Sequence, residues 1–412
     1  MTKSEQVLAA LESQDIEMVE VYLEEAIAQD SPDLLLELGE YMLGLGLTDY
    51  AKSLFEAVQS DFPLESALNI AIILYDEGQI EEAFSYLEEI PDTSPIYLRA
   101  LLTKADFYQA EGLSDVAREK LIEARRLSDD PIIVFGLAEL NMELENYRDA
   151  IEDYATLDHE VIYEATGIST YQRIGLAYAY LGKFEAAVEF LEKSLELAYN
   201  DKTLHEIALL CLEREEYDRA TIYFKQLDTL NPDYEGYEIA YALALEGNHQ
   251  LERALEITQK GIEKNPFDGP LLLEASKLAY ETHQKDLSER YLKEAMTVSE
   301  YLDEAVLRLA KIYLKDERYE ELVELESEHL DNLVAKWYIA QAYRFLEDYK
   351  EAGIRYAALE SELAHYPDFL KDYGEFLLES GNRSDAKRIL SVYLEEVPDD
   401  GDLLDRLESI EG

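Results

Sequence analysis

Small side chains, most often alanine, recur at a nearly constant interval along most of this chain. Successive members of the series lie 30 to 37 residues apart, and most lie 33 or 34 apart. A second series of small residues stands about twelve positions before the first. The first series is Ala51, Ala83, Ala117, Ala150, Ala187, Ala220, Ala254, Ser288, Leu322, Ala352 and Ala386, in which Ser288 and Leu322 replace the alanine; the second is Gly39, Ala71, Ala105, Ala138, Gly175, Ala208, Ala240, Ser276, Ala310, Ala340 and Gly374. Such self-similarity predicts a stack of identical supersecondary units.

The clearest unit, residues 170–200, predicts that each repeat is a helical hairpin. Its apolar residues fall at helical spacing on both sides of a turn at Leu181 and Gly182. Ile174 and Tyr178 belong to the stripe of the first helix, and Leu191 belongs to the stripe of the second. Each stripe needs the other helix to cover it.

This pattern resembles the tetratricopeptide repeat, which carries small residues at positions 8 and 20, glycine near 15, aromatic residues at 17 and 24, and proline at 32. Residues 32–65 fit it with Gly39, Gly46, Ala51, Phe55 and Pro63. The resemblance implies an all-α fold, a right-handed α-solenoid superhelix of about 11–12 hairpins. The chain is similar to long acidic cytoplasmic tetratricopeptide proteins of Gram-positive bacteria.

The repeats suggest one continuous domain with two atypical ends. Residues 1–31 predict a degenerate hairpin, residues 32–400 the tandem repeats, and residues 401–412 a short capping helix over the last apolar face. The long step between Ala150 and Ala187 makes residues 160–169 a candidate joint, with a harmless longer loop as the alternative. We expect the two extra residues of the 235–268 repeat to lie in its turn.

Composition favours a non-secreted protein. No uninterrupted apolar stretch approaches the ~18 residues that a membrane helix needs. The first residues, MTKSEQ, lack a basic segment followed by an apolar one, so we expect a cytoplasmic protein without membrane insertion. The single cysteine, Cys211, excludes an internal disulfide, and its place in the repeat predicts a packing role.

The net charge of −55 is unevenly distributed. Residues 1–98 hold 22 acidic side chains and only two basic ones, Lys3 and Lys52. A solvated surface explains this acidity, and a docking surface for a basic protein segment is the alternative. Either way, the charge repels phosphate backbones and anionic lipid, so we expect no nucleic acid among the partners.

No pattern in the sequence predicts catalysis or a bound cofactor. The six histidines are scattered over different repeats and lack the spacing that would place two of them on one metal ion. No phosphate-binding glycine loop, dinucleotide fingerprint or nucleophile elbow occurs. We therefore expect a protein that is not an enzyme, with no catalytic residues, metal or cofactor.

The resemblance implies that first helices line a concave groove through positions 2, 5, 9, 12 and 13. Transferred to this chain, these positions give cations and aromatic residues that would hold an acidic, aromatic-containing segment. The alternative is that the cations only neutralise neighbouring carboxylates. The candidates are Tyr234, Tyr237, Tyr241, Lys277, Tyr280, Lys311, Lys315, Trp337, Arg344, Phe345 and Lys371, with Trp337 as the expected anchor.

Two functions of different classes remain open. The favoured one is a scaffold or adaptor that binds protein or peptide partners in the groove, with homo-oligomerisation through an end face left open. The alternative resembles the peptide-sensing regulators of bacterial quorum sensing, although only one hairpin precedes the repeats and no basic recognition helix is found there.

Overall fold

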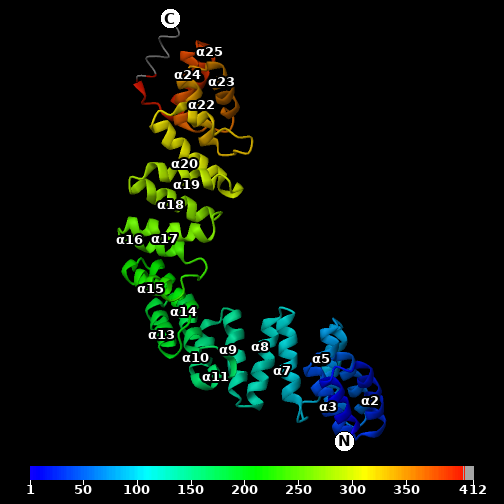
Figure 1. The fold of residues 1–412 in the computed structure, drawn as a ribbon. Coiled ribbons are helices and arrows are strands. Elements are labelled where there is room, and N and C mark those ends of the chain that lie inside the picture. Colours follow the sequence, from blue (N-terminus) through cyan, green and yellow to red (C-terminus); the bar gives the residue numbers. More distant parts are fainter. Residues whose placement is uncertain (402, 404–412) are drawn as a thin grey trace. The chain divides into compact units, whose positions relative to one another are not determined.

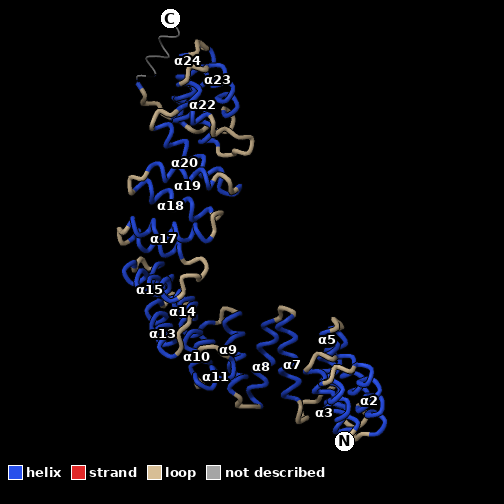
Figure 2. Tube along the Cα trace, in the orientation of Figure 1, coloured by secondary structure: helices blue, strands red, loops and turns tan. Residues whose placement is uncertain are grey.

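The computed structural model describes residues 1–401 and 403, and these residues form helices joined by loops and turns (Figures 1 and 2). The chain divides into two compact units, residues 1–203 and 204–412. The first unit contains α1 (Lys3–Glu12), α2 (Ile16–Gln29), α3 (Pro32–Gly44), α4 (Thr48–Val58), α5 (Pro63–Asp76), α6 (Ile80–Glu88), α7 (Tyr97–Ala110), α8 (Ser114–Leu127), α9 (Pro131–Glu143), α10 (Tyr147–Ala155), α11 (His159–Thr166), α12 (Thr170–Tyr180) and α13 (Phe184–Leu197).

The second unit begins within the first turn of α14 (Asp201–Glu213). It continues with α15 (Tyr217–Leu230), α16 (Glu238–Gly247), α17 (Leu251–Lys264), α18 (Gly269–Glu281), α19 (Lys285–Ala295), the 3₁₀ turn η1 (Ser299–Tyr301), α20 (Leu302–Lys315), α21 (Tyr319–Val323), α22 (Leu333–Phe345), α23 (Tyr349–Leu359), α24 (Pro367–Glu379) and α25 (Arg383–Glu396).

Consecutive helices pack as hairpins within each unit. In the first unit α3 packs against α4 and α7 against α8, and in the second α18 packs against α19 and α24 against α25. Neighbouring hairpins then stack, for example α17 on α18. The expected all-α repeat architecture is therefore confirmed.

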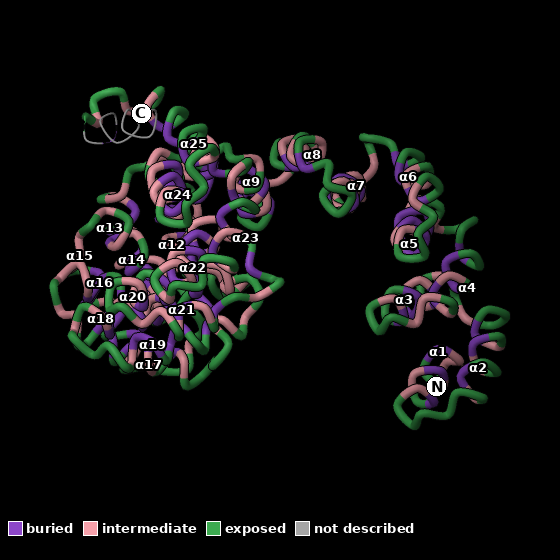
Figure 3. Tube along the Cα trace, turned by 90° about the horizontal axis from the view of Figure 1, so that it is seen from above, coloured by how far each residue is buried: buried purple, intermediate pink, exposed green. Residues whose placement is uncertain are grey.

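The two series of small residues lie where the helices of a hairpin approach each other. Ala51 is fully buried, and Gly39 faces the ring of Phe55, which is also fully buried. Gly175 lies so close to the second helix of its hairpin that an added Cβ would be 3.0 Å from the backbone oxygen of Ala187. Buried stretches alternate with exposed ones along the helices, as an apolar stripe on one face requires (Figure 3).

From α3 to α25, each hairpin turns through a residue with positive φ, five positions before the member of the first series. Glycine occupies this place in five repeats, and glutamate or histidine occupies it in the others. These residues are Gly46, Gly78, Gly112, Glu145, Gly182, Glu215, His249, His283, Glu317, Glu347 and Gly381. A left-handed residue ends the first helix and reverses the chain in the same way each time.

This regularity corrects the expected place of the insertion in the 235–268 repeat. His249 has φ +56° and precedes Ala254 by the usual five residues, so the turn has its normal length. Ala242, twelve residues before Ala254, is fully buried and takes the small-residue place that Ala240 was expected to hold. The extra residues therefore lie before α16, in the loop that precedes Glu238.

The long step between Ala150 and Ala187 holds an additional helix, α11. Its Ile162 is fully buried in a cluster with Phe135 and Tyr154, and Gly167 ends the helix with φ +71°. The division between the two units falls after Thr203, outside this segment. A joint at residues 160–169 stays a prediction. Of the expected capping segment, residues 402 and 404–412 lie outside the described residues.

A pair of glycines in α3 tests the packing of the small residues. In Gly39→Ala the new Cβ would lie 2.7 Å from the Phe55 ring, and we expect a loss of about 1–3 kcal/mol in the free energy of unfolding because the core is overpacked. Gly44→Ala is the matched control, since nothing lies within 4 Å of its Cβ. It should leave stability unchanged or slightly higher. Urea unfolding followed by circular dichroism compares the two, and equal losses would contradict the packing argument.

Candidate functional site

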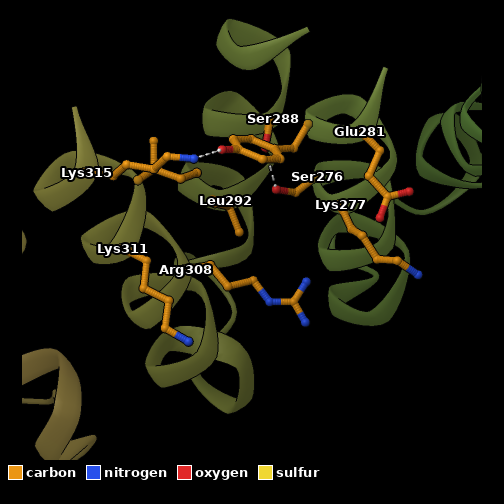
Figure 4. Close-up of a pocket in the computed structure, with 10 residues that line it drawn as sticks. Ser276, Lys277, Glu281, Ser288, Leu292, Arg308, Lys311 and Lys315 are labelled. Carbon is orange, nitrogen blue, oxygen red and sulfur yellow. Dashed lines mark hydrogen bonds between the residues drawn. The ribbon is translucent and has the colours of Figure 1, made fainter. Parts of the chain in front are cut away.

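A pocket of about 400 Å³ lies in the second unit between α18, α19 and α20 (Figure 4). Four of the predicted groove residues line it together: Lys277, Tyr280, Lys311 and Lys315. Its other lining residues are Ser276, Glu281, Ser288, Leu292, Arg308 and Ile312. Four cationic side chains and one carboxylate thus surround an open space in a chain with a large excess of acidic residues.

The helices place these side chains on opposite walls. α18 supplies Lys277 on one side, and α20 supplies Lys311 and Lys315 on the other (Figure 4). α18 also supplies Tyr280, whose hydroxyl reaches across to the Lys315 ammonium. Leu292 of α19 lies between the two walls. At the back of the pocket the hydroxyls of Ser276 and Ser288, which are both buried, hydrogen-bond to each other at 3.0 Å.

The four cations differ in how far neighbouring carboxylates neutralise them. Lys277 pairs with Glu246 at 2.6 Å and with Glu274 at 3.1 Å. Burial opposes the charge of Lys277, but its hydrogen bonds to Glu246 and then Glu274 outweigh burial and raise its pKa. Arg308 pairs with Glu304 at 2.6 Å and donates a second hydrogen bond to the backbone oxygen of Leu273 at 3.1 Å.

Lys311 and Lys315 carry charge that no carboxylate of the described residues neutralises. Within residues 1–401 and 403, neither forms an ion pair, and both are exposed. The Lys315 ammonium donates a hydrogen bond to the hydroxyl of Tyr280 at 3.3 Å, and it lies 6.0 Å from the centre of that ring. The α20 wall is therefore the electropositive side of the pocket.

Two of the predicted groove residues instead belong to a partly buried network around Asp372. The Trp337 indole nitrogen donates a hydrogen bond to Asp372 at 2.6 Å, and Arg344 pairs with the other carboxylate oxygen at 2.6 Å. Gln341 and Tyr356 also donate to Asp372. Since Trp337 is only 7% exposed, its expected role as the anchor of a ligand is wrong. Arg344 is committed to Asp372 and Glu379.

The three tyrosines predicted for one groove face do not lie together on a surface. Tyr237 and Tyr241 are each 1% exposed, and Tyr237 donates a hydrogen bond to Asp228 at 2.5 Å. Tyr234 lies in the loop before α16, with its ring 5.1 Å from that of His205. The expectation failed because the two-residue insertion precedes the helix, which turns Tyr241 into the core.

The two remaining candidates lie outside the pocket. Phe345 is 51% exposed and stacks on Tyr319 with ring centres 4.8 Å apart. Lys371 pairs with Asp400 at 2.8 Å. Neutralisation by neighbouring carboxylates, the alternative weighed for the groove cations, thus describes Lys371 and Arg344.

Arg308 was missed by sequence reasoning, although the signal was present. It precedes Lys311 by three residues and Lys315 by seven, so all three share one face of α20. Extending the cationic face by one turn toward the start of the helix would have included it.

Metal binding and membrane insertion find no support in the described part of the chain. No group of three or more histidine, cysteine, aspartate or glutamate side chains there has a geometry that could hold a metal ion. None of the helices searched is both long and apolar enough to span a bilayer.

Comparisons with known proteins agree with the repeat architecture. A family model described as YpiA-like, C-terminal tetratricopeptide repeats matches residues 334–400. A second, described as YpiA-like, tetratricopeptide repeats, matches residues 109–161, and the general tetratricopeptide repeat matches residues 168–201. The TPR repeat-containing protein YpiA of Bacillus subtilis (strain 168) is 30% identical over 357 residues, which cover 85% of this chain and 84% of the relative.

Solved structures with similar folds are more distant. A tetratricopeptide repeat protein from Parabacteroides merdae is 17% identical, with 66% of this chain and 94% of that chain covered and a TM-score of 0.37. YrrB, described as a TPR protein with an unusual peptide-binding site, is 16% identical, with 43% of this chain and 91% of that chain covered and a TM-score of 0.37. Matches at this level carry no argument about the pocket.

The hairpin repeats, together with the family models and the Bacillus relative, define a tetratricopeptide repeat protein. Because the similarity to the Bacillus protein extends over most of both chains, this chain belongs to the YpiA-like family of such proteins.

Removing the carboxylate at the centre of the Trp337 network should destabilise the second unit. In Asp372→Ala the buried indole and Tyr356 hydroxyl lose their shared acceptor, and we expect a loss of about 3–5 kcal/mol. Glu379→Ala is the control, because Glu379 is 47% exposed and should cost less than about 1 kcal/mol. Trp337 is the sole tryptophan of the chain, so its fluorescence reports urea unfolding of this region. Similar losses for both variants would contradict the network.

Alkaline pH should weaken the same region. Burial, followed by the charge of Asp372, raises the pKa of Tyr356 above its ordinary value of 10.0. The folded state therefore holds this proton more tightly, and the resulting stabilisation is complete below pH 10 and is lost as the pH rises further. We expect the urea midpoint reported by Trp337 to fall above pH 10, and to fall less in Tyr356→Phe. Identical pH profiles would rule out this contribution.

Proposed function

We propose that this chain is a non-catalytic cytoplasmic scaffold that binds an acidic, aromatic-containing segment of a protein partner in the pocket between α18 and α20. The proposal rests on one observation above all: Lys311 and Lys315 line a space large enough for a side chain and form no ion pair with any carboxylate in the part of the chain that the structure describes. Membership in a repeat family supports it, because stacked repeats present extended surfaces suited to binding.

The chemistry of the lining favours a peptide over a bare inorganic ion. The Tyr280 ring, Leu292 and Ile312 offer an apolar surface beside the cations, and burying apolar area contributes about 25 cal/mol per Å². An ion such as phosphate could use only the charges. A segment with both acidic and aromatic side chains uses the whole lining.

A basic segment bound to the acidic repeats of residues 1–98 is the second part of the proposal. The ion pairs there are few: the amino group of Met1 with Glu5, Lys3 with Glu25, Lys52 with Glu77, and Glu40 with Arg99, which follows this region. Most carboxylates of this region therefore have no cation beside them, which would speed the encounter with a basic partner.

Synthetic peptides test the pocket directly. The probe is a fluorescein-labelled peptide of twelve residues, acetylated and amidated, with four glutamates and two phenylalanines in a glycine and serine background. We expect it to bind the full chain, and a peptide with lysine in place of glutamate not to bind at this site. The double variant Lys311→Glu/Lys315→Glu should weaken binding at least roughly tenfold, because charge attraction becomes repulsion.

Lys350→Glu is the matched control for this experiment. Lys350 lies in the same unit, is 84% exposed and has only a 3.8 Å contact with Glu351, so its reversal should leave affinity within about twofold. Helicity and the urea midpoint are compared for all variants. If the double variant keeps its fold and binds the acidic peptide as well as the unaltered chain does, the proposed pocket is wrong.

A further inference from the structure

The two unneutralised lysines are spaced as alternate residues of an extended chain are spaced. Lys311 and Lys315 are four residues apart on α20, a rise of about 6 Å at ~1.5 Å per residue. In a β-strand, side chains on the same face are separated by two residues, or about 6.6 Å. Two carboxylates at positions i and i+2 of an extended segment would therefore each meet one ammonium group.

The opposite wall receives the residue between the two acidic ones. In an extended segment the side chain at i+1 points away from those at i and i+2. With its carboxylates toward α20, such a segment directs its middle side chain toward α18, which supplies Tyr280, and toward Leu292 of α19 between the two walls. The carboxylate that meets Lys315 takes the place of the Tyr280 hydroxyl, which lies 3.3 Å from that ammonium group. Aromatic pairs of this kind favour offset or edge contacts between the rings.

A helical ligand fits this arrangement less well. Opposite faces of an α-helix are separated by a full diameter of about 10–12 Å, whereas the two walls come as close as 3.3 Å, between the Lys315 ammonium and the Tyr280 hydroxyl. A helix could meet one wall at a time. An extended segment meets both, because consecutive side chains point in opposite directions.

The cations that are already paired do not compete with Lys311 and Lys315 for the carboxylates of the segment. Lys277 is held by Glu246 and Glu274 on the α18 side, so that wall has little charge to offer a third carboxylate. Glu281, at the edge of the same wall, repels an acidic middle residue. The difference in charge between the two walls thus favours a segment with acidic side chains toward α20 and an uncharged side chain toward α18.

We propose that the pocket recognises a short sequence pattern, an acidic residue, an aromatic or large apolar residue and a second acidic residue, bound in extended conformation. Its two carboxylates face Lys311 and Lys315, and its middle side chain lies against Tyr280 and Leu292. This inference rests on the proposed function, because it names the feature of the partner segment that the same pocket reads.

Two peptides with the same amino-acid composition but a different order of residues show whether affinity depends on the pattern or only on the composition. Two labelled nonamers, acetylated and amidated, carry either Glu-Phe-Glu or Glu-Glu-Phe at the centre of the same glycine and serine sequence. Fluorescence anisotropy with the full chain at low salt should show the alternating peptide binding roughly tenfold more tightly. Affinities within twofold of each other would overturn the proposal.

Three variants assign the contacts within the pocket. Lys311→Gln and Lys315→Gln should each lower the affinity for the alternating peptide several-fold, and Lys350→Gln should not. Tyr280→Ala should remove the preference for phenylalanine over alanine at the middle position of the peptide, which a merely destabilising change would not do. A preference that survives in Tyr280→Ala would place the middle side chain elsewhere.

The outcomes for this pattern and for the proposed function are distinguishable. If both peptides bind equally and both lysine variants weaken them, the pattern is wrong and the acidic-segment pocket stands. If neither peptide binds, or if binding ignores both lysines, both proposals fail. Inorganic phosphate serves as a competitor. If the two peptides bind with equal affinity and the same phosphate concentration displaces both, the pocket is a general anion site and the proposed pattern is wrong.

Discussion

Close approach of two helices at small side chains is the constraint on which this structure depends. At Gly175 an added Cβ would meet both the backbone oxygen of Ala187 and the side chain of Leu191. The two helices can therefore lie this close only because residue 175 has no side chain. Cores packed at this density tolerate few changes in volume. Gly39 and Gly374 make the same close approach to Phe55 and Leu390 in their hairpins. The left-handed turn residue five positions before the member of the first series then reverses the chain.

This local character explains why the fold could be predicted and where the prediction failed. Small residues and helical stripes are visible in the sequence because each hairpin lies within about 34 consecutive residues. The left-handed position is visible when glycine fills it. In the 235–268 repeat it is His249, which gives no such signal, and the register was set on Ala240 instead of Ala242. Because the predicted register was shifted by two residues, Tyr237 and Tyr241 were assigned to the groove although they lie in the core.

The sequence predicted those site residues whose position depends only on which face of their helix they occupy. Lys277, Tyr280, Lys311 and Lys315 line one pocket because the repeat register places them on facing sides of α18 and α20. The position of a residue within its repeat does not show which hydrogen-bond partners a neighbouring repeat places beside it. Trp337 has the position of a groove residue, yet its nitrogen is bonded to Asp372, 35 residues further along the chain. A tertiary partner of this kind decides whether a polar side chain belongs to the core or to a ligand.

The offsets of the ion pairs that Arg344 and Lys277 form reach no carboxylate when they are counted from Lys311 and Lys315. Arg344 finds its carboxylates 28 and 35 residues ahead, at Asp372 and Glu379, and Lys277 finds one 31 residues behind, at Glu246. The two forward offsets from Lys311 reach Ile339 and Leu346, and those from Lys315 reach Tyr343 and Lys350. Counting 31 residues back from Lys311 gives Tyr280, and from Lys315 it gives Gln284.

The three sequence offsets that serve Arg344 and Lys277 therefore bring aromatic, apolar, amide or basic residues to Lys311 and Lys315. An acidic residue supplied by another molecule would complete at α20 the pairing that the chain completes for itself at α22 and α24.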